Sequence, residues 1–147
     1  TKTIKKDLKP INMNKKEIEE NLEINLQFDK RGGLIPAIAQ DAETGEILMI
    51  GSANQEAFNK TLELGLATFY STSRNELWTK GLTSGDYLEI TDILVDCDQD
   101  ALIYQVIRKG KGACHTKTKD NAARRSCFYR KLNISQHKLV WKSKDLE

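Results

Sequence analysis

The spacing of hydrophobic positions predicts a helix near the start of the chain. Asn14 is a favourable N-cap residue, and Glu17 stands where the second member of a capping box is expected. Ile18, Leu22 and Leu26 then follow at intervals of four residues. Because residues at this spacing share one face of a helix, we expect an amphipathic helix of about three turns.

The pattern beyond residue 32 predicts strands, with a second helix between them. Asn54 is expected to cap this helix, Ala57, Phe58 and Leu62 supply its apolar positions, and Gly65 ends it. Short apolar runs and period-two alternation, bounded by turn residues, predict strands at 34–40, 47–50, 67–71, 76–79, 87–95, 101–107, 128–130 and 139–141.

Pro36 constrains the first of these strands. Because proline has no backbone N–H, we expect the strand 34–40 to lie at an edge of its sheet or to contain a bulge. The fold class that follows from all these elements is α+β, mainly β with two helices. Residues 1–13 are polar and lysine-rich, so we expect a loose basic arm followed by a single domain over 14–147.

Composition indicates the class of protein. Apolar residues make up 39% and charged residues 30% of the chain, which is typical of a water-soluble globular protein. The sequence has no apolar run long enough to span a bilayer, and its first residues lack the apolar block of a secretory signal. We therefore expect a cytoplasmic protein that does not engage a membrane.

The basic residues are unevenly distributed. The net charge of +2 is too small to indicate a nucleic-acid partner. Between Arg108 and Lys131, however, nine basic residues are opposed by a single acid, Asp120. Such a segment is either a solvated basic loop, which is the common case, or a positive field suited to a phosphorylated small molecule.

A short acidic segment, 96–100, follows the strand predicted at 87–95. Side chains alternate along a strand, so Asp96, Asp98 and Asp100 are expected on one face and Cys97 on the other. Three carboxylates on one face repel one another unless a cation or water lies between them, and their hard oxygens suit magnesium or calcium. An ordinary hairpin turn, which favours aspartate, explains the carboxylates at least as well.

The three cysteines, Cys97, Cys114 and Cys127, cannot all pair within one chain. Without a secretion signal they are expected to be reduced, and are then either buried apolar residues or metal ligands. As ligands they would supply three thiolates to zinc and leave a fourth position for water, as in catalytic zinc sites. His115 would then serve as general base or proton shuttle; otherwise it is an ordinary hydrogen-bonded loop histidine.

Several segments together resemble the phosphoribosyl-AMP cyclohydrolase family, over roughly residues 28–130. Ordered motifs in register are far more specific than any single motif. The segments that carry the resemblance are Phe28-Asp29, Leu34-Ile35-Pro36-Ala37, Gln40-Asp41, Gly45-Glu46-Ile47-Leu48-Met49, Asn54-Gln55-Glu56-Ala57, Ser71-Thr72-Ser73-Arg74, Leu77-Trp78-Thr79-Lys80-Gly81, Thr83-Ser84-Gly85, Asp96-Cys97-Asp98-Gln99-Asp100-Ala101-Leu102, Cys114-His115-Thr116 and Ser126-Cys127-Phe128.

This resemblance implies a mixed, barrel-like sheet in an intertwined homodimer. The active site would be shared, with zinc thiolates contributed by both subunits. The metal ligands it implies are Cys97, Cys114 and Cys127 for zinc, and Asp96, Asp98 and Asp100 for magnesium.

The reaction implied by the resemblance is the hydrolysis of phosphoribosyl-AMP, the third step of histidine biosynthesis. A zinc-activated water would add to C6 of the adenine ring, and the N1–C6 bond would break to leave a formamidine. His115 is the candidate for moving the proton. The residues expected to contact the substrate, including its two phosphates, are Ser73, Arg74, Lys80, Thr83, Ser84, Arg124 and Arg125.

The chain departs from the family pattern in three places. Residues 117–123 stand where the family usually has a single glycine. Lengthening a flexible loop costs on the order of 1–2 kcal/mol, so Cys127 is still expected to reach the metal. Ser52-Ala53-Asn54 replaces the family's usual Tyr-Met-Asn. The pyrophosphohydrolase domain often fused downstream is absent from the sequence, so we expect the cyclohydrolase step alone.

Two other functions are consistent with parts of the pattern. A zinc-holding module would bind RNA or a nucleotide through the basic loop, but Phe128 and Tyr129 are its only evident neighbouring aromatics for stacking on bases. A non-catalytic relative that keeps the fold is the other alternative, and the inserted loop is the feature that favours it.

Overall fold

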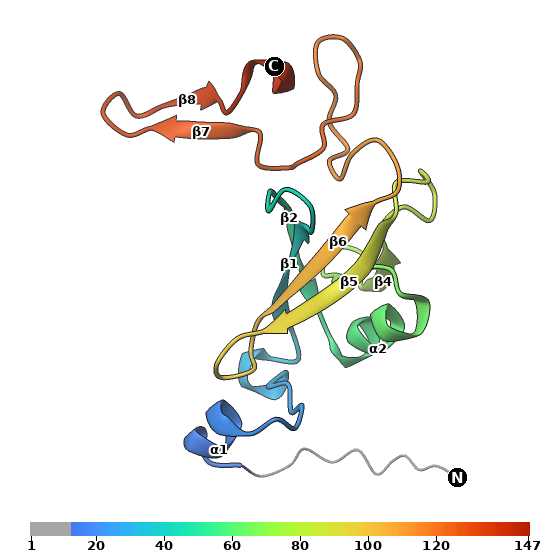
Figure 1. Ribbon diagram of the computed structural model, residues 1–147, viewed down its shortest axis with the longest axis vertical. Helices are drawn as coiled ribbons and strands as arrows, with labels where there is room; N and C mark the ends of the chain where they lie inside the picture. The colour runs from blue at the N-terminus through green and yellow to red at the C-terminus, as the bar shows by residue number, and fades with distance from the viewer. Residues whose placement is uncertain (1–12) are drawn as a thin grey trace.

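A curled six-stranded sheet forms the centre of the structure, a computed structural model that describes residues 13–147 (Figure 1). Its strands are β1 (Ile35–Asp41), β2 (Ile47–Ala53), β3 (Thr68–Ser71), β4 (Glu76–Thr79), β5 (Leu88–Val95) and β6 (Leu102–Arg108). Their order is β4-β3-β2-β1-β6-β5, and β1 and β6 are the one parallel pair among these neighbours. The sheet closes half of a barrel, which confirms the mixed, mainly β fold with two helices. The arm expected at 1–13 lies outside the described residues, except for residue 13.

Of the two alternatives that Pro36 predicted for β1, an edge position or a bulge, the edge position is wrong, whereas the strand does contain an irregularity. β1 is internal and pairs with β2 on one side and β6 on the other. Pro36 stands opposite Ser52 of β2, but the parallel ladder with β6 begins only at Ala37, opposite Leu102. The proline therefore precedes the stretch of β1 that is paired on both sides. Because proline has no backbone N–H, this position avoids the loss of a hydrogen bond to β6. A register shift between Ala39 and Gln40 does interrupt the β1–β2 ladder, three residues further on.

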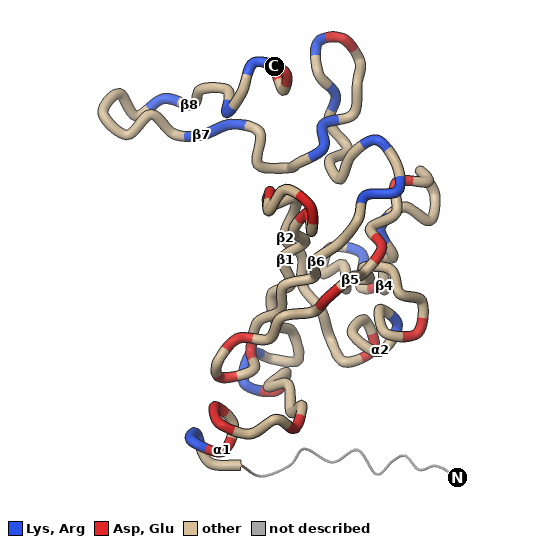
Figure 2. Tube along the Cα trace, viewed as in Figure 1, with Lys and Arg blue, Asp and Glu red and all other residues tan. Residues whose placement is uncertain are grey.

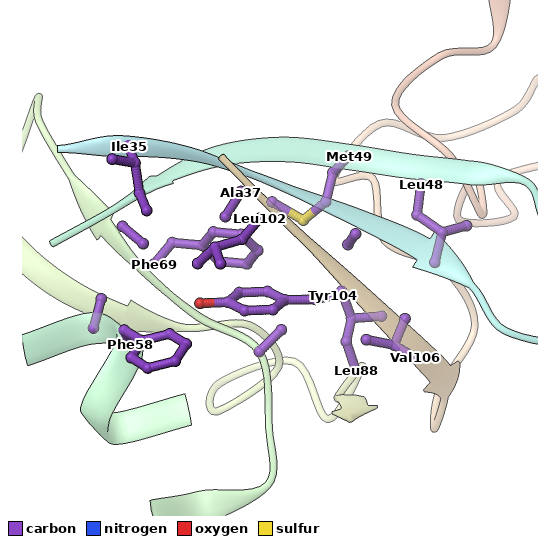
Figure 3. Packing of buried hydrophobic residues seen from close by; sticks show 14 of the residues in the cluster. Ile35, Ala37, Leu48, Met49, Phe58, Phe69, Leu88, Leu102, Tyr104 and Val106 are labelled. Carbon is purple, nitrogen blue, oxygen red and sulfur yellow. The ribbon is translucent and has the colours of Figure 1, made fainter. Parts of the chain in front are cut away.

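The core packs between the sheet and α2 (Gln55–Leu64). Alternate residues of β1 are buried in it, and Tyr104 of β6 lies near its centre, with its ring centroid 5.8 Å from that of Phe69 (Figure 3). The helix begins after the Asn54 cap, whose side chain accepts a hydrogen bond from the N–H of Ala57. It ends at Gly65, where a φ of 69° is the left-handed conformation that glycine adopts easily. Both ends agree with the sequence prediction.

The first helix, α1 (Lys15–Glu20), is shorter than the three turns that were predicted. The capping box of Asn14 and Glu17 is present, but the helix ends at Asn21 in an extended conformation and buries no side chain. Leu22 beyond it is fully exposed, so the apolar spacing did not produce a packed helical face. Short helices need such packing, because propensity alone does not stabilise them in water. Within residues 13–147, no helix is long and apolar enough to cross a membrane.

The chain after β6 leaves the sheet and ends in a separate hairpin, β7 (Arg130–Asn133) and β8 (Lys138–Trp141). The two short strands predicted at 128–130 and 139–141 are therefore present, although the first begins two residues later than expected. This hairpin lies beyond one end of the sheet, whereas α1 and the β5–β6 turn lie at the other end (Figure 1).

Candidate metal and phosphate-binding site

The turn between β5 and β6 brings three carboxylates together. Oxygens of Asp96, Asp98 and Asp100 lie within 4.8 Å of one another. Alternation along a strand predicted this grouping, but β5 ends at Val95 and the following residues form a turn. Gln99 reverses the backbone there with a φ of 57°. The turn, and not strand alternation, therefore directs the three carboxylates towards one point.

Basic side chains of the short 3-10 helix that precedes β1 (Asp29–Arg31) offset the charge of this acidic turn. Lys30 Nζ lies 3.0 Å from Oδ2 of both Asp98 and Asp100, and Arg31 also donates to Asp100. Lys30 holds the pKa of Asp100 well below its usual range, although burial opposes the shift. Burial and the hydrogen bond with Asp100 raise the pKa of Asp96. The oxygens that converge at the turn are hard ligands of the kind that suit magnesium. In this structure the ammonium group of Lys30 partly neutralises their negative charge.

Gln99 fastens the segment after α1 to the acidic turn. Its side chain accepts a hydrogen bond from the N–H of Asn25 and donates to the carbonyl groups of Ile18 and Glu23. These contacts bury Gln99. The N-terminal segment thereby forms one wall of a hollow of about 300 Å³, and Cys97 lies in the opposite wall.

Cys114 lies in a short irregular ladder that follows β6. Its N–H donates to the carbonyl of Arg124, and the N–H of Arg124 donates to the carbonyl of Thr116. Gly112 is required here, because a Cβ atom would lie 2.3 Å from the carbonyl oxygen of Arg124. The Cys114 sulfur accepts the N–H of Thr116 at 3.4 Å and lies 2.9 Å from the Thr116 hydroxyl. These contacts fix the position of the Cys114 side chain.

The edge of β2 positions Cys127 beside Cys114. The Cys127 N–H donates to the carbonyl of Leu48 at 2.7 Å, and the hydroxyl of Ser126 donates to the same strand. The two thiols lie close enough for Cys114 to influence the pKa of Cys127. Partial burial raises the pKa of Cys127 to about 11, Cys114 adds to this shift, and nearby Lys80 opposes it. A thiol with this pKa is protonated at neutral pH, so a metal that binds there must displace the proton.

Cys97 lies far from this thiol pair within one chain. It precedes β6, whereas Cys114 and Cys127 follow that strand at its other end (Figure 1). The seven residues of β6, at about 3.3 Å each, separate the two ends by about 23 Å. Each chain, as far as the structure describes it, thus has two thiols at one end and a single thiol at the other. The soft sulfur ligands suit zinc, but a site with all three requires two copies of the chain.

A second hollow, of about 430 Å³, lies along β4 and the turn after it. Gly81 shapes this turn, because its φ is 94° and a Cβ atom there would lie 2.5 Å from the backbone of Asp86. The charge of Lys80 works to lower the pKa of Cys127, so the hollow that Lys80 lines lies within electrostatic range of the thiol pair. The predicted substrate contacts that line it are Arg74, Lys80, Thr83 and Ser84. Ammonium, guanidinium and hydroxyl donors of this kind suit phosphate oxygens.

Arg124 and Arg125 are engaged within the chain rather than in this hollow. Arg124 is buried and donates to the carbonyl of Leu146 at 2.7 Å. Arg125 donates to Glu46 at 2.8 Å and to Asp145 at 2.7 Å. Both side chains therefore hold the C-terminal segment in place, and their contact with substrate stays a prediction.

Two further predicted residues, Ser73 and His115, are exposed outside the lining of the hollow. The structure also places Lys30 and Arg31 against the acidic turn and gives Gln99 partners near α1, and the sequence predicted neither. These residues meet partners 68 to 81 positions away in the chain. No local motif signals such contacts, since they arise only when the N-terminal segment folds against the turn.

Known proteins match the chain across this region. The sequence model of the phosphoribosyl-AMP cyclohydrolase family matches residues 49–129, which include the thiols, the acidic turn and the hollow. A phosphoribosyl-AMP cyclohydrolase of Desulfatibacillum aliphaticivorans is 53% identical over 107 residues, or 73% of this chain and 81% of that protein. One of Methanothermobacter thermautotrophicus is 44% identical over 128 residues, or 86% of this chain and 88% of that protein. The histidine biosynthesis bifunctional protein HisIE of Aquifex aeolicus is 47% identical over 109 residues, covering 74% of this chain and 50% of that protein. The chain belongs to the phosphoribosyl-AMP cyclohydrolase family of enzymes.

Proposed function

We propose that this chain hydrolyses phosphoribosyl-AMP in histidine biosynthesis, opening the adenine ring at its N1–C6 bond. The observation that carries the proposal is the thiol pair of Cys114 and Cys127 beside Lys80, which lines the hollow along β4. Metal-binding thiols next to a cationic hollow are suited to hydrolysis of a phosphorylated nucleotide. The product would be the formimino-aminoimidazole carboxamide ribonucleotide.

Zinc would be held by Cys114 and Cys127 of one copy and Cys97 of a second copy. The position of Cys97 at the far end of β6 supports this arrangement, and the homodimer is part of the proposal. Three thiolates leave one position for water, and zinc supplies there a water acidic enough to act as a nucleophile near neutral pH. Reduced thiols also favour a cytoplasmic location.

The reaction conserves both protons of the attacking water. From the neutral imine form of the base, the water oxygen joins C6 and becomes the carboxamide oxygen while the N1–C6 bond breaks. One proton ends on the exocyclic nitrogen and the other on N1, which becomes part of the formamidine. We assign the movement of the proton to His115, which is exposed beside Cys114.

The hollow along β4 would bind a phosphate of the substrate through Arg74, Lys80, Thr83 and Ser84. Arg74 lies 3.5 Å from Glu76 in an exposed ion pair, which is weak enough to yield to a phosphate. The other contacts carried by the family resemblance are Ser73, Arg124 and Arg125.

Magnesium would bind at the acidic turn, through Asp96, Asp98 and Asp100. The convergence of their oxygens supports this assignment, and Lys30 would have to release two of them. Since Cys97 belongs to the same turn, the magnesium would lie near the shared zinc and near the substrate.

Turnover of phosphoribosyl-AMP, followed by ultraviolet absorbance with and without a zinc chelator, tests this function. We expect turnover that the chelator abolishes and that added zinc restores. A folded, zinc-loaded protein without turnover would contradict the proposal and favour a non-catalytic relative.

A further inference from the structure

The β7–β8 hairpin has one apolar face and one polar face. Residues directly opposite each other in an antiparallel pair share a face, and here Leu132 is opposite Leu139, while Arg130 is opposite Trp141. The side chains on the other face are those of Lys131, Asn133, Lys138 and Val140. Three of the four residues on the first face are therefore large and apolar.

This apolar face is exposed in the single chain. Leu132, Leu139 and Trp141 are 53%, 58% and 40% exposed. Arg124 and Tyr129 lie against the ring of Trp141 but leave the two leucines open. A two-stranded ribbon is only marginally stable in water unless a hydrophobic face is covered, so the hairpin requires a surface to pack against.

A complementary surface lies at the other end of the molecule. The hollow of about 300 Å³ beside the acidic turn is lined by Leu22, Ile24 and Val95, together with Cys97. All three apolar side chains are exposed, although they belong to two segments that pack together. This hollow therefore presents uncovered apolar surface next to a predicted zinc ligand.

The two ends also carry opposite charge (Figure 2). Residues 108–147 hold twelve basic and three acidic side chains. Residues 13–31 together with 96–100 hold eight acidic and four basic side chains. A second copy, turned end to end, would place basic on acidic surface twice, which is the arrangement of a two-fold dimer.

We propose that the apolar face of the β7–β8 hairpin docks into the hollow beside Cys97 of a second copy of this chain. This inference rests on the proposed function, because a zinc ion shared by Cys127 and the partner's Cys97 fixes which ends meet. Arg130, the first residue of β7, is three residues after Cys127, or about 10 Å of extended chain. The hairpin thus starts within reach of the hollow and closes the shared site on that side.

The test is the association state of the zinc-loaded full chain in sedimentation velocity runs over a dilution series. Leu139→Glu puts a carboxylate on the docking face, and we expect the dimer dissociation constant to rise by about 100-fold. Leu62→Glu on α2 is the matched control, because Leu62 is 59% and Leu139 58% exposed. The control should dimerise like the parent chain.

Two variants that change Leu22, on the opposite surface, test the same contact even if Leu139→Glu unfolds the hairpin. Leu22→Glu, at a fully exposed position, should weaken the dimer as much. The double variant Leu22→Lys with Leu139→Glu should regain dimer, because each contact then pairs opposite charges across the two copies. An unweakened Leu139→Glu dimer with one zinc per chain would overturn the hairpin contact and leave the shared zinc standing. A monomeric parent chain with one zinc per chain would instead contradict the zinc site shared between two copies. It would therefore also contradict the docking of the hairpin.

Discussion

At the residue scale, Asp41 illustrates how a buried charge stabilises this fold. Its carboxylate accepts hydrogen bonds from the N–H groups of Glu43 and Thr44 and from Arg108, and it is almost fully buried. Replacing Asp41 by Asn keeps the shape but removes the charge, so we expect a loss of about 2 kcal/mol in the free energy of unfolding at pH 7. Urea denaturation of both proteins measures this difference.

The same residue predicts a dependence on pH. Burial works to raise the pKa of Asp41, but the N–H groups of Glu43 and Thr44 together with Arg108 outweigh it and lower the pKa. A carboxylate whose pKa is lowered by folding stabilises the fold fully above its unfolded pKa of about 3.9, and this contribution is lost as the pH falls through the folded value. The difference between the two proteins should therefore shrink below about pH 4. An equal difference at pH 3 and pH 7 would show that Asp41 does not act through its charge.

Lys30 gives a second prediction at this scale. Its ammonium lies 3.0 Å from carboxylates of two proposed magnesium ligands, Asp98 and Asp100, so it competes with the ion for their oxygens. Replacing Lys30 by Met should tighten magnesium binding several-fold in calorimetric titration of the zinc-loaded protein. Lys60→Met, which removes a comparable exposed ion pair with Glu63, should leave the affinity unchanged. Weaker binding in Lys30→Met would mean that the ammonium orders the turn rather than competing.

The chemistry of single residues was predictable from sequence where it depended on residue type and close spacing. The aspartates of the acidic turn belong to this class, whereas for Cys114 and Cys127 residue type and spacing left open whether they are buried apolar residues or metal ligands. The contacts of Lys30 and Gln99 were not predictable, because they join the acidic turn to residues near the N-terminus that are distant in the chain. The position of Cys97 away from the other thiols was expected only through the family resemblance.

At the element scale, the inserted loop is closed at its base, and Lys119 within it contacts Glu147. Lys117 and Ala123 form an isolated bridge, and the N–H of Thr118 donates to the carbonyl of Ala122, so the insertion folds back on itself. The hydrogen bonds that position Cys114 join residues 114–116 to Arg124, so they lie on the side of this bridge away from the loop. The departure from the family pattern therefore leaves the thiol pair in place.

Shortening this loop is the corresponding prediction. Replacing residues 118–122 with an Asn-Gly turn should leave zinc content unchanged, because the bridge that closes the loop is retained. Metal analysis of the purified variant measures zinc per chain, and thermal unfolding shows whether the fold survives. Loss of zinc from a folded variant would show that the insertion itself supports the thiols.

The accuracy of the predicted elements differed between segments of the chain. β5, β6 and α2 lie on the core, and their hydrophobic patterns gave nearly correct bounds. α1 was predicted too long because its apolar residues have no core to face. The edge position inferred from Pro36 failed because a strand can be internal over only part of its length. The largely exposed strands β4 and β8 were also predicted with nearly correct bounds, so turn residues on both sides of a short strand can define it without burial.

At the scale of the whole molecule, the separation of the cysteines predicts complementation between two inactive chains. In Cys97→Ser the thiol pair at the basic end is intact, and in Cys127→Ser the single thiol at the acidic end is intact. A mixed dimer therefore has one complete site, made from the intact Cys97 of one chain and the intact pair of the other. Random pairing of equal amounts gives mixed dimers half of the time, so about one quarter of all sites should be complete.

Mixing the two variants, each inactive alone, should accordingly restore about one quarter of the turnover and tightly bound zinc of the parent chain. Unfolding and refolding the mixture together allows the subunits to exchange. A control mixture of Cys114→Ser with Cys127→Ser should restore nothing, because both changes affect the same end and every site lacks one ligand. Equal recovery in both mixtures, or recovery in neither, would contradict a site built from opposite ends of two chains. Recovery confined to the first mixture would follow directly from the roughly 23 Å that β6 places between Cys97 and its proposed co-ligands.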